Sequence, residues 1–166
     1  MSAIADTSPL NYLVRLDYSD VLQDIYRTVS VPRAVLEELS HPRSPGEVRA
    51  WIADAPRWLK LVDIDTLDPA LPANLGPGER AAITLARIEP ESILLIDDRD
   101  GRLAAAERNI EVAGTMTVLS EASLRGRLNF RETIARLKAL GFRLSAEHES
   151  AIMKRHEEKL RRMRLS

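Results

Sequence analysis

The chain of 166 residues contains no cysteine. This absence excludes disulfide bonds, thiolate zinc sites and cysteine nucleophiles, and it fits the reducing cytoplasm in which we expect the protein to work. No apolar run approaches the ~20 residues that span a bilayer. The first residues combine neither a basic region nor a long apolar stretch, so we expect no secretion signal and no membrane partner.

An excess of charge of one sign is also missing. The chain has 24 basic and 25 acidic residues, which gives a net charge of −1. No global field therefore draws it onto nucleic acid or a membrane, although a local patch still can. Hydrophobic residues make up 45% of the sequence and charged residues 30%, which is typical of a globular domain with its own core.

Apolar segments of two kinds alternate along the chain. Strands are predicted at residues 3–5, 28–31, 58–64, 93–96 and 111–113, the third of them more exposed than the others. Helices are predicted between them, the first one capped by Ser8, and further helices follow to the C-terminus. This alternation predicts an α/β fold, a three-layer α/β/α sandwich with a mainly parallel central sheet.

The stretch "ILLIDD" is unusual because a buried strand runs directly into two carboxylates, Asp97 and Asp98. Adjacent acids repel each other unless a positive charge lies beside them. Asp6 likewise follows the first predicted strand. Ligand sites of parallel sheets lie beyond the carboxyl ends of the strands. If the two strands are neighbours, these three acids converge on one site.

Two helices are expected to bring further acids to that site. On a helical wheel Glu38 lies at the edge of an apolar stripe, whereas Glu37 points away from it. Glu79 lies within the buried face of the helix "GERAAITLARI", whose outer side takes Arg80, Thr84 and Arg87. A glutamate on a core face is costly unless it is paired or binds a metal.

Each acid also has a purely structural interpretation. Glu79 suits the dipole at a helix N-terminus, Asp6 suits a turn or cap, and Asp98 suits the cap of the next helix. The combination points to chemistry, because four distant regions present a carboxylate to one edge of the predicted sheet. Clustered carboxylates, without cysteine and without suitably spaced histidines, favour a hard cation, Mg²⁺ or Mn²⁺.

The order of these acids resembles that of PIN domains. The segments "IADTSPL", "VPRAVLEEL", "LGPGERAAITLA", "ILLIDDRDGRLAA" and "GTMTVLSEASLRGRL" are similar, in this order, to the acidic and Gly-rich segments of one bacterial PIN subgroup. The resemblance runs from about residue 3 to 145. The third acid is Glu79 where Asp is more usual. The fourth region offers two acids, of which Asp98 matches better by spacing and Asp97 is close behind.

The resemblance implies a metal-dependent endoribonuclease, often the toxin of a toxin–antitoxin pair that a small partner protein holds inactive. It implies Asp6, Glu38, Glu79 and Asp98 as catalytic residues and Asp6, Asp97, Asp98 and Glu79 as metal ligands. Thr7, Ser8, Arg99 and Arg102 are the candidates for contact with RNA.

The predicted domain organisation is a nuclease domain over residues 1–145 and a C-terminal helix over 146–166. This helix ends in the basic run "KLRRMRLS" and is expected to pack on the domain or on a partner, an antitoxin or a second copy of the chain. Two other functions stay open. One is a PIN fold that binds nucleic acid or protein without catalysis. The other is a phosphatase of the haloacid dehalogenase type, for which Asp98-Arg99-Asp100 offers an Asp-x-Asp element at an unusually late position.

Overall fold

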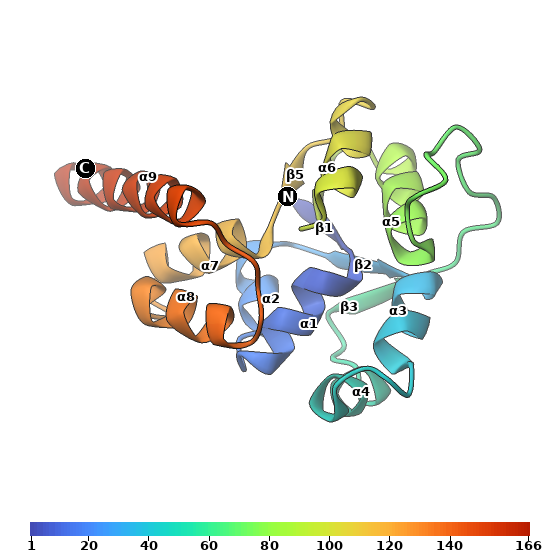
Figure 1. Ribbon diagram of the computed structural model, residues 1–166, viewed down its shortest axis with the longest axis horizontal. Coiled ribbons are helices and arrows are strands. Elements are labelled where there is room, and N and C mark those ends of the chain that lie inside the picture. Colours follow the sequence, from blue (N-terminus) through green and yellow to red (C-terminus); the bar gives the residue numbers. More distant parts are fainter. The chain divides into compact units, whose positions relative to one another are not determined.

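A computed structural model describes all residues from Met1 to Ser166. Five parallel strands form one sheet in the order β3-β2-β1-β4-β5 (Figure 1). The strands are β1 (Ser2–Ala5), β2 (Val29–Pro32), β3 (Leu59–Val62), β4 (Ser92–Leu95) and β5 (Val112–Ala113). The parallel α/β fold predicted from the alternating segments is therefore confirmed, and β3 lies at an edge of the sheet, in keeping with its expected exposure.

Helices connect the strands and continue after them. They are α1 (Thr7–Arg15), α2 (Val21–Ile25), α3 (Arg33–Ser40), α4 (Gly46–Ala53), α5 (Pro77–Ile88), α6 (Arg99–Ala106), α7 (Thr115–Leu124), α8 (Phe130–Ala139) and α9 (Ala146–Leu165). The helix α2 has only five residues and was not predicted, because one turn is too short for a helical period to appear in sequence. None of the helices is both long and apolar enough to cross a membrane.

The chain divides into two compact units, Met1–Thr115 and Met116–Ser166. The first unit holds the sheet and the helices α1 to α6, and the second holds α8, α9 and nearly all of α7. The boundary expected after residue 145 falls inside the second unit. There α9 packs through His156, whose ring lies 4.2 Å from that of Phe130 and whose Nδ1 lies 2.8 Å from the Ser120 hydroxyl.

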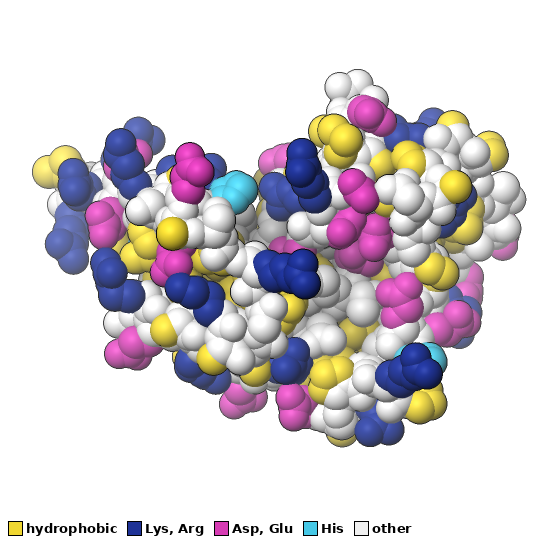
Figure 2. Space-filling model, viewed as in Figure 1, with side chains coloured by type: hydrophobic (Ala, Val, Ile, Leu, Met, Phe, Trp, Pro, Cys, Tyr) yellow, Lys and Arg dark blue, Asp and Glu magenta, His cyan; other side chains and the backbone are white.

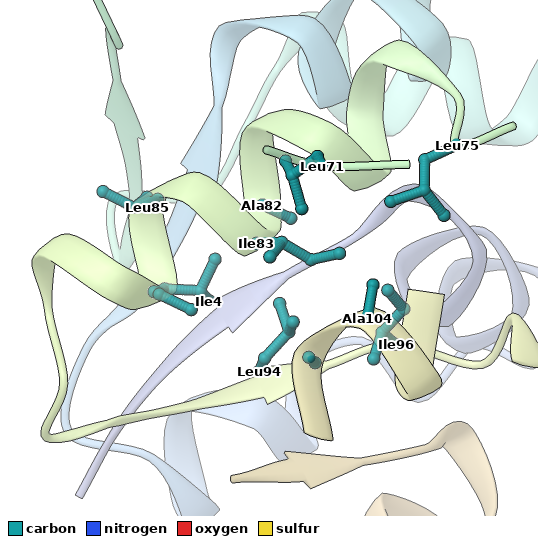
Figure 3. Packing of buried hydrophobic residues seen from close by; sticks show 11 residues of the cluster. Ile4, Leu71, Leu75, Ala82, Ile83, Leu85, Leu94, Ile96 and Ala104 are labelled. Atoms are coloured by element: carbon teal, nitrogen blue, oxygen red, sulfur yellow. The ribbon is translucent and has the colours of Figure 1, made fainter. Parts of the chain in front are cut away.

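One hydrophobic cluster of the first unit lies between the sheet and the pair α5 and α6. Ile4, Leu94 and Ile96 come from alternate positions of β1 and of the β4 segment, so they point to one face of the sheet. There they pack against Ile83 of α5 and Ala104 of α6 (Figure 3). The residues between them are also buried, which is why both segments read as continuous apolar runs.

Two local predictions for this unit were wrong. The helix α1 begins at Thr7 with Asp6 in the N-cap position, so Ser8 does not cap it. Thr84, placed on the outer side of α5, is buried. Its hydroxyl donates to the Arg80 carbonyl oxygen at 2.7 Å and accepts from the Asp68 main-chain N–H at 3.1 Å. The bond from Asp68 shows that the segment between β3 and α5 covers this side of the helix, which a helical wheel cannot predict.

Asp68 anchors the long segment that joins β3 to α5. Its carboxylate accepts from Arg87 Nη1 at 2.6 Å, from Arg108 Nε at 3.1 Å and from the Ala70 main-chain N–H at 2.9 Å. The Ala70 bond, followed by the Arg87 bond, lowers the pKa of Asp68 to about 2. One buried carboxylate thus ties the segment to the end of α5 and to the residues after α6.

We expect Asp68→Asn to lower the melting temperature at pH 7 by several degrees. The lowered pKa means that the ionised form stabilises the fold above the ordinary pKa of 3.8, and that this contribution is lost as the pH falls through about 2. Thermal melting from pH 7 to pH 2 should therefore show wild type and variant converging at the acid end. Asp65→Asn, at an exposed position in the same segment, is the matched control. A constant gap between the Asp68 curves would contradict the assignment.

Candidate active site

The carboxyl ends of β1 and β4 place two acids side by side. The strands pair in parallel, Ala5 opposite Leu95, and the Asp6 main-chain N–H donates to the Leu95 carbonyl oxygen at 2.9 Å. Asp6 and Asp97 therefore leave the same edge of the sheet, which confirms that the two acid-terminated strands are neighbours. Figure 2 shows acidic side chains gathered in one patch where α3, α5 and α6 meet.

Glu38 reaches this edge from α3. The helix buries Val35 and Leu39, which leaves Glu38 at the border of the packed face and Glu37 exposed, as the wheel predicted. The Glu38 carboxylate accepts from the Thr7 hydroxyl and, at 2.8 Å, from the Gly78 main-chain N–H. This N–H belongs to the first turn of α5, where main-chain donors have no partner within the helix. Glu38 therefore joins α1, α3 and α5.

Glu79 lies in the first turn of α5 and is half-buried. Burial raises its pKa to about 7, with smaller contributions from the negative charges of Asp98, Glu38 and Asp100 and from a hydrogen bond to Asp98. A helix N-terminus alone would favour the ionised carboxylate and hence a lower pKa. The raised pKa indicates that burial, together with the neighbouring acids, outweighs the dipole at this position.

Asp97 and Asp98 have different surroundings. Asp97 accepts from the Ser8 hydroxyl at 3.1 Å, from the Thr115 main-chain N–H at 2.7 Å and from the Thr115 hydroxyl at 2.6 Å. Asp98 is exposed and caps α6, its Oδ2 accepting from the Gly101 main-chain N–H at 3.0 Å. The cap role that the sequence left open for Asp98 is thus present, together with the closeness of Asp98 to Glu79.

Asp6 lies at the centre of the set and is only 4% exposed. It makes no side-chain cap bond to α1, and its Oδ1 is buried without any hydrogen-bond partner. Burial raises its pKa to about 7. The Thr7 main-chain N–H opposes this shift, and the charges of Glu79, Glu38 and Asp97 add to it. A buried carboxylate oxygen without a donor, among three other acids, is an uncompensated negative charge.

The donor set suits a hard divalent cation, because every candidate ligand is a carboxylate oxygen. No three acidic or histidine side chains are already arranged to hold an ion together. Most of the acids instead accept hydrogen bonds from neighbouring hydroxyl and main-chain groups. Mg²⁺ usually keeps several waters and needs only one or two protein carboxylates. The Asp6 oxygen without a hydrogen-bond partner, together with one carboxylate of a neighbouring acid, is therefore enough to bind it.

The four residues predicted to contact RNA divide into two pairs. The hydroxyls of Thr7 and Ser8 donate to Glu38 and Asp97, so both support acids of the site. Arg102 is half-buried and donates through Nη1 to the Ile96 carbonyl oxygen at 3.2 Å. Arg99 is exposed in the first turn of α6, directly after the acids. RNA contact stays a prediction for all four.

Sequence reasoning missed two groups that hold the acids. Thr115 donates two hydrogen bonds to Asp97, and Gly78 gives Glu38 a main-chain donor at a position where any side chain would displace the carboxylate. A β-carbon at Gly78 would lie 2.5 Å from Glu38 Oε2. The available signal was a hydroxyl residue just after the last predicted strand, in the segment "GTMTVL".

An all-parallel α/β sheet with acids gathered at the carboxyl edge of its middle strands defines the class of this protein. The chain belongs to the PIN-domain family, whose model matches residues 2–158. PIN domains are generally nucleases and generally use divalent metals. A comparison with curated protein sequences finds no match.

A solved structure supports the fold. It is a PilT N-terminus domain protein from the hyperthermophilic archaeon Sulfolobus solfataricus P2, similar with a TM-score of 0.52 and 15% sequence identity. The match covers 74% of this chain and 93% of the archaeal chain. At this identity the likeness bears on the fold alone.

We expect Asp6→Asn to stabilise the metal-free protein at pH 8. A folded-state pKa raised from 3.8 to about 7 means that ionisation of Asp6 opposes folding, so the contribution of this carboxyl to stability is greatest below pH 4 and is lost as the pH rises through 7. Removing this charge should restore ~2–4 kcal/mol at pH 8. Urea unfolding in chelator at pH 5 and pH 8 measures the difference. A variant less stable than wild type at pH 8 would refute the assigned burial of charge.

Proposed function

We propose that this chain is a metal-dependent endoribonuclease that hydrolyses RNA phosphodiester bonds. The observation that carries the proposal is the buried Asp6 oxygen, which has no hydrogen-bond partner and lies among further acids at the carboxyl edge of β1 and β4. Such a charge burdens the fold unless a cation binds it. Family membership supports nuclease activity. RNA as the substrate and the requirement for a metal ion are proposed in addition.

In this scheme Asp6, Asp97, Asp98 and Glu79 supply the ligands for Mg²⁺ or Mn²⁺. When bound, such an ion activates a water for attack on phosphorus and stabilises charge on the leaving oxygen. Glu38 keeps α3 and α5 in place around the site through Thr7 and Gly78.

The pKa of Glu79 is about 7 in the metal-free protein. Binding of the ion to its carboxylate should therefore release a proton near neutral pH, so that metal affinity rises with pH.

The cluster of acids repels the phosphate backbone, so RNA binding needs positive charge beside it. Arg99 and Arg102 lie within the first turn of α6, directly after Asp97 and Asp98. We assign them to the phosphates that flank the scissile bond. Thr7 and Ser8 lie at the start of α1 and donate their hydroxyl protons to Glu38 and Asp97. We therefore assign them to the same strand of RNA as acceptors, for hydrogen bonds from ribose 2′-hydroxyls.

The sharpest test is RNA cleavage with Mg²⁺ or Mn²⁺, with and without chelator. We expect wild type to cleave only with metal and Asp6→Asn to lose at least ~100-fold in rate, equivalent to ~2.7 kcal/mol of transition-state stabilisation. Glu38→Gln and Glu37→Gln form a matched pair on one helix. The first should lose activity because Glu38 accepts from Thr7 and Gly78, and the second should not because Glu37 is exposed. Cleavage by wild type in chelator would rule out the metal requirement.

The two alternatives give different results in this assay. A binding module without catalysis would shift the mobility of RNA but leave it intact under every condition. A phosphatase would release phosphate from a small phosphomonoester and spare RNA. The fold disfavours the phosphatase, because Asp98 and Asp100 follow the fourth strand and Asp98 caps α6.

We further propose that the protein is the toxin of a toxin–antitoxin pair. This rests on the PIN-domain family resemblance. The end of α9 leaves Met163 and Leu165 54% and 89% exposed beside several arginines, a surface that a small antitoxin or a second copy of the chain would cover.

Expression of wild type without a partner should arrest bacterial growth within a few generations, because an unrestrained ribonuclease depletes cellular RNA. Asp6→Asn, expressed to the same level of folded protein, should allow normal growth. Growth curves with immunoblots for protein level make the comparison. Equal growth of both strains, with wild type purified from them active on RNA, would remove the toxin role while leaving the nuclease proposal intact.

A further inference from the structure

Asp97 is the most heavily supported acid of the site, and most of that support comes from one residue. Thr115 donates its main-chain N–H to Asp97 Oδ1 at 2.7 Å and its hydroxyl to Oδ2 at 2.6 Å. Thr115 is fully buried, so water does not compete for these bonds. The Ser8 hydroxyl adds a longer bond of 3.1 Å to Oδ2. Both oxygens of the carboxylate are therefore fixed in direction.

The sheet brings Thr115 to this position. The last strand, β5, pairs with β4, Leu95 opposite Ala113, and the Ile96 main-chain N–H donates to the Ala113 carbonyl oxygen at 2.9 Å. The residues that follow each strand, Asp97 and Gly114-Thr115, consequently leave the edge together. Two donors on one residue then match the two oxygens of one carboxylate.

Gly114 shows how closely the main chain approaches this carboxylate. A β-carbon at Gly114 would lie 2.9 Å from Asp97 Oδ1, closer than real contacts allow, and 3.0 Å from Arg102 Nη1, which is unusually tight. Any side chain here would push the carboxylate or the guanidinium aside. Glycine thus permits the approach from which Thr115 makes its two bonds.

Asp98 lacks comparable support. It is exposed and accepts from the Gly101 main-chain N–H, as an ordinary helix cap does. The two neighbouring acids also act on different partners, since Asp97 bears electrostatically on Asp6 and Asp98 on Glu79. Fixing Asp97 therefore sets the negative charge next to the buried Asp6 oxygen.

We infer that Thr115 is a positioning residue whose hydroxyl holds the Asp97 carboxylate aimed beside Asp6, so that cation affinity depends on it. The inference rests on the metal requirement of the proposed function. Loss of a hydrogen-bonding partner behind a metal ligand typically weakens metal affinity ~10–100-fold.

The inference is tested by measuring Mn²⁺ binding to the full chain by isothermal titration calorimetry, without RNA. Thr115→Val keeps the shape but removes the hydroxyl, and we expect the Kd for Mn²⁺ to rise at least ~10-fold. Thr115→Ser keeps the hydroxyl and should bind within ~3-fold of wild type. Thr133→Val is the control for losing a buried hydroxyl elsewhere, since Thr133 donates to the Asn129 carbonyl oxygen in α8 at 2.7 Å. Its Kd should not change.

Thermal melting in chelator separates positioning from folding. Thr115→Val and Thr133→Val should both melt at lower temperature, and only the first should also lose Mn²⁺ affinity. If Thr115→Val does not fold, Ser8→Ala removes the longer bond to Asp97 at a half-buried position and should raise the Kd by a smaller factor. An unchanged Kd in Thr115→Val, or in Ser8→Ala where that variant replaces it, overturns the inference.

Failure of the proposed function gives a different pattern. Wild type that binds Mn²⁺ but does not cleave RNA would refute the nuclease proposal, and the variants would still decide the role of Thr115. Wild type that binds no Mn²⁺ would refute both the metal requirement and the positioning role.

Discussion

The parallel pairing of β1 with β4 is the constraint on which the site depends. It aligns Ala5 with Leu95 and so delivers Asp6 and Asp97 to one edge of the sheet. Both strands are buried on both faces, so a slip in register would move whole rows of core side chains. The position of these two acids is therefore fixed by the hydrophobic core, and the repulsion between them cannot be relieved by moving the strands.

Hydrogen-bond donors stabilise some of these acids and leave others without support. Glu38 and Asp97 accept hydrogen bonds from side-chain hydroxyls and main-chain N–H groups, whereas one oxygen of Asp6 accepts none. Burial, with smaller contributions from neighbouring acids, raises the pKa values of Asp6 and Glu79 to about 7, so keeping these carboxylates ionised costs stability near neutral pH. A fold that keeps such a cost at one edge while it satisfies Asp68 fully elsewhere is typical of a functional site.

The sequence allowed the fold and the main acids to be predicted because both depend on simple periods. Apolar runs located the strands, and the wheel placed Glu38 inward and Glu37 outward, as the structure has them. Contacts that depend on exact side-chain direction were not predictable. Thr84 is covered by the segment that carries Asp68, and Thr115 reaches Asp97 only because two strands end side by side. No periodic pattern of residues in the sequence signals either contact.

The adjacent pair Asp97-Asp98 illustrates how one motif can hold two different roles. Successive residues after a strand point in different directions, so one carboxylate turns toward Asp6 and Thr115 while the next caps α6. Spacing within a family cannot separate them, because they differ by one position. Their hydrogen-bond donors distinguish the two acids. A buried threonine fixes Asp97, and a helix N-terminus holds Asp98 at the surface beside Glu79. Two acids in sequence thus extend the negative pocket in two directions from a single strand end.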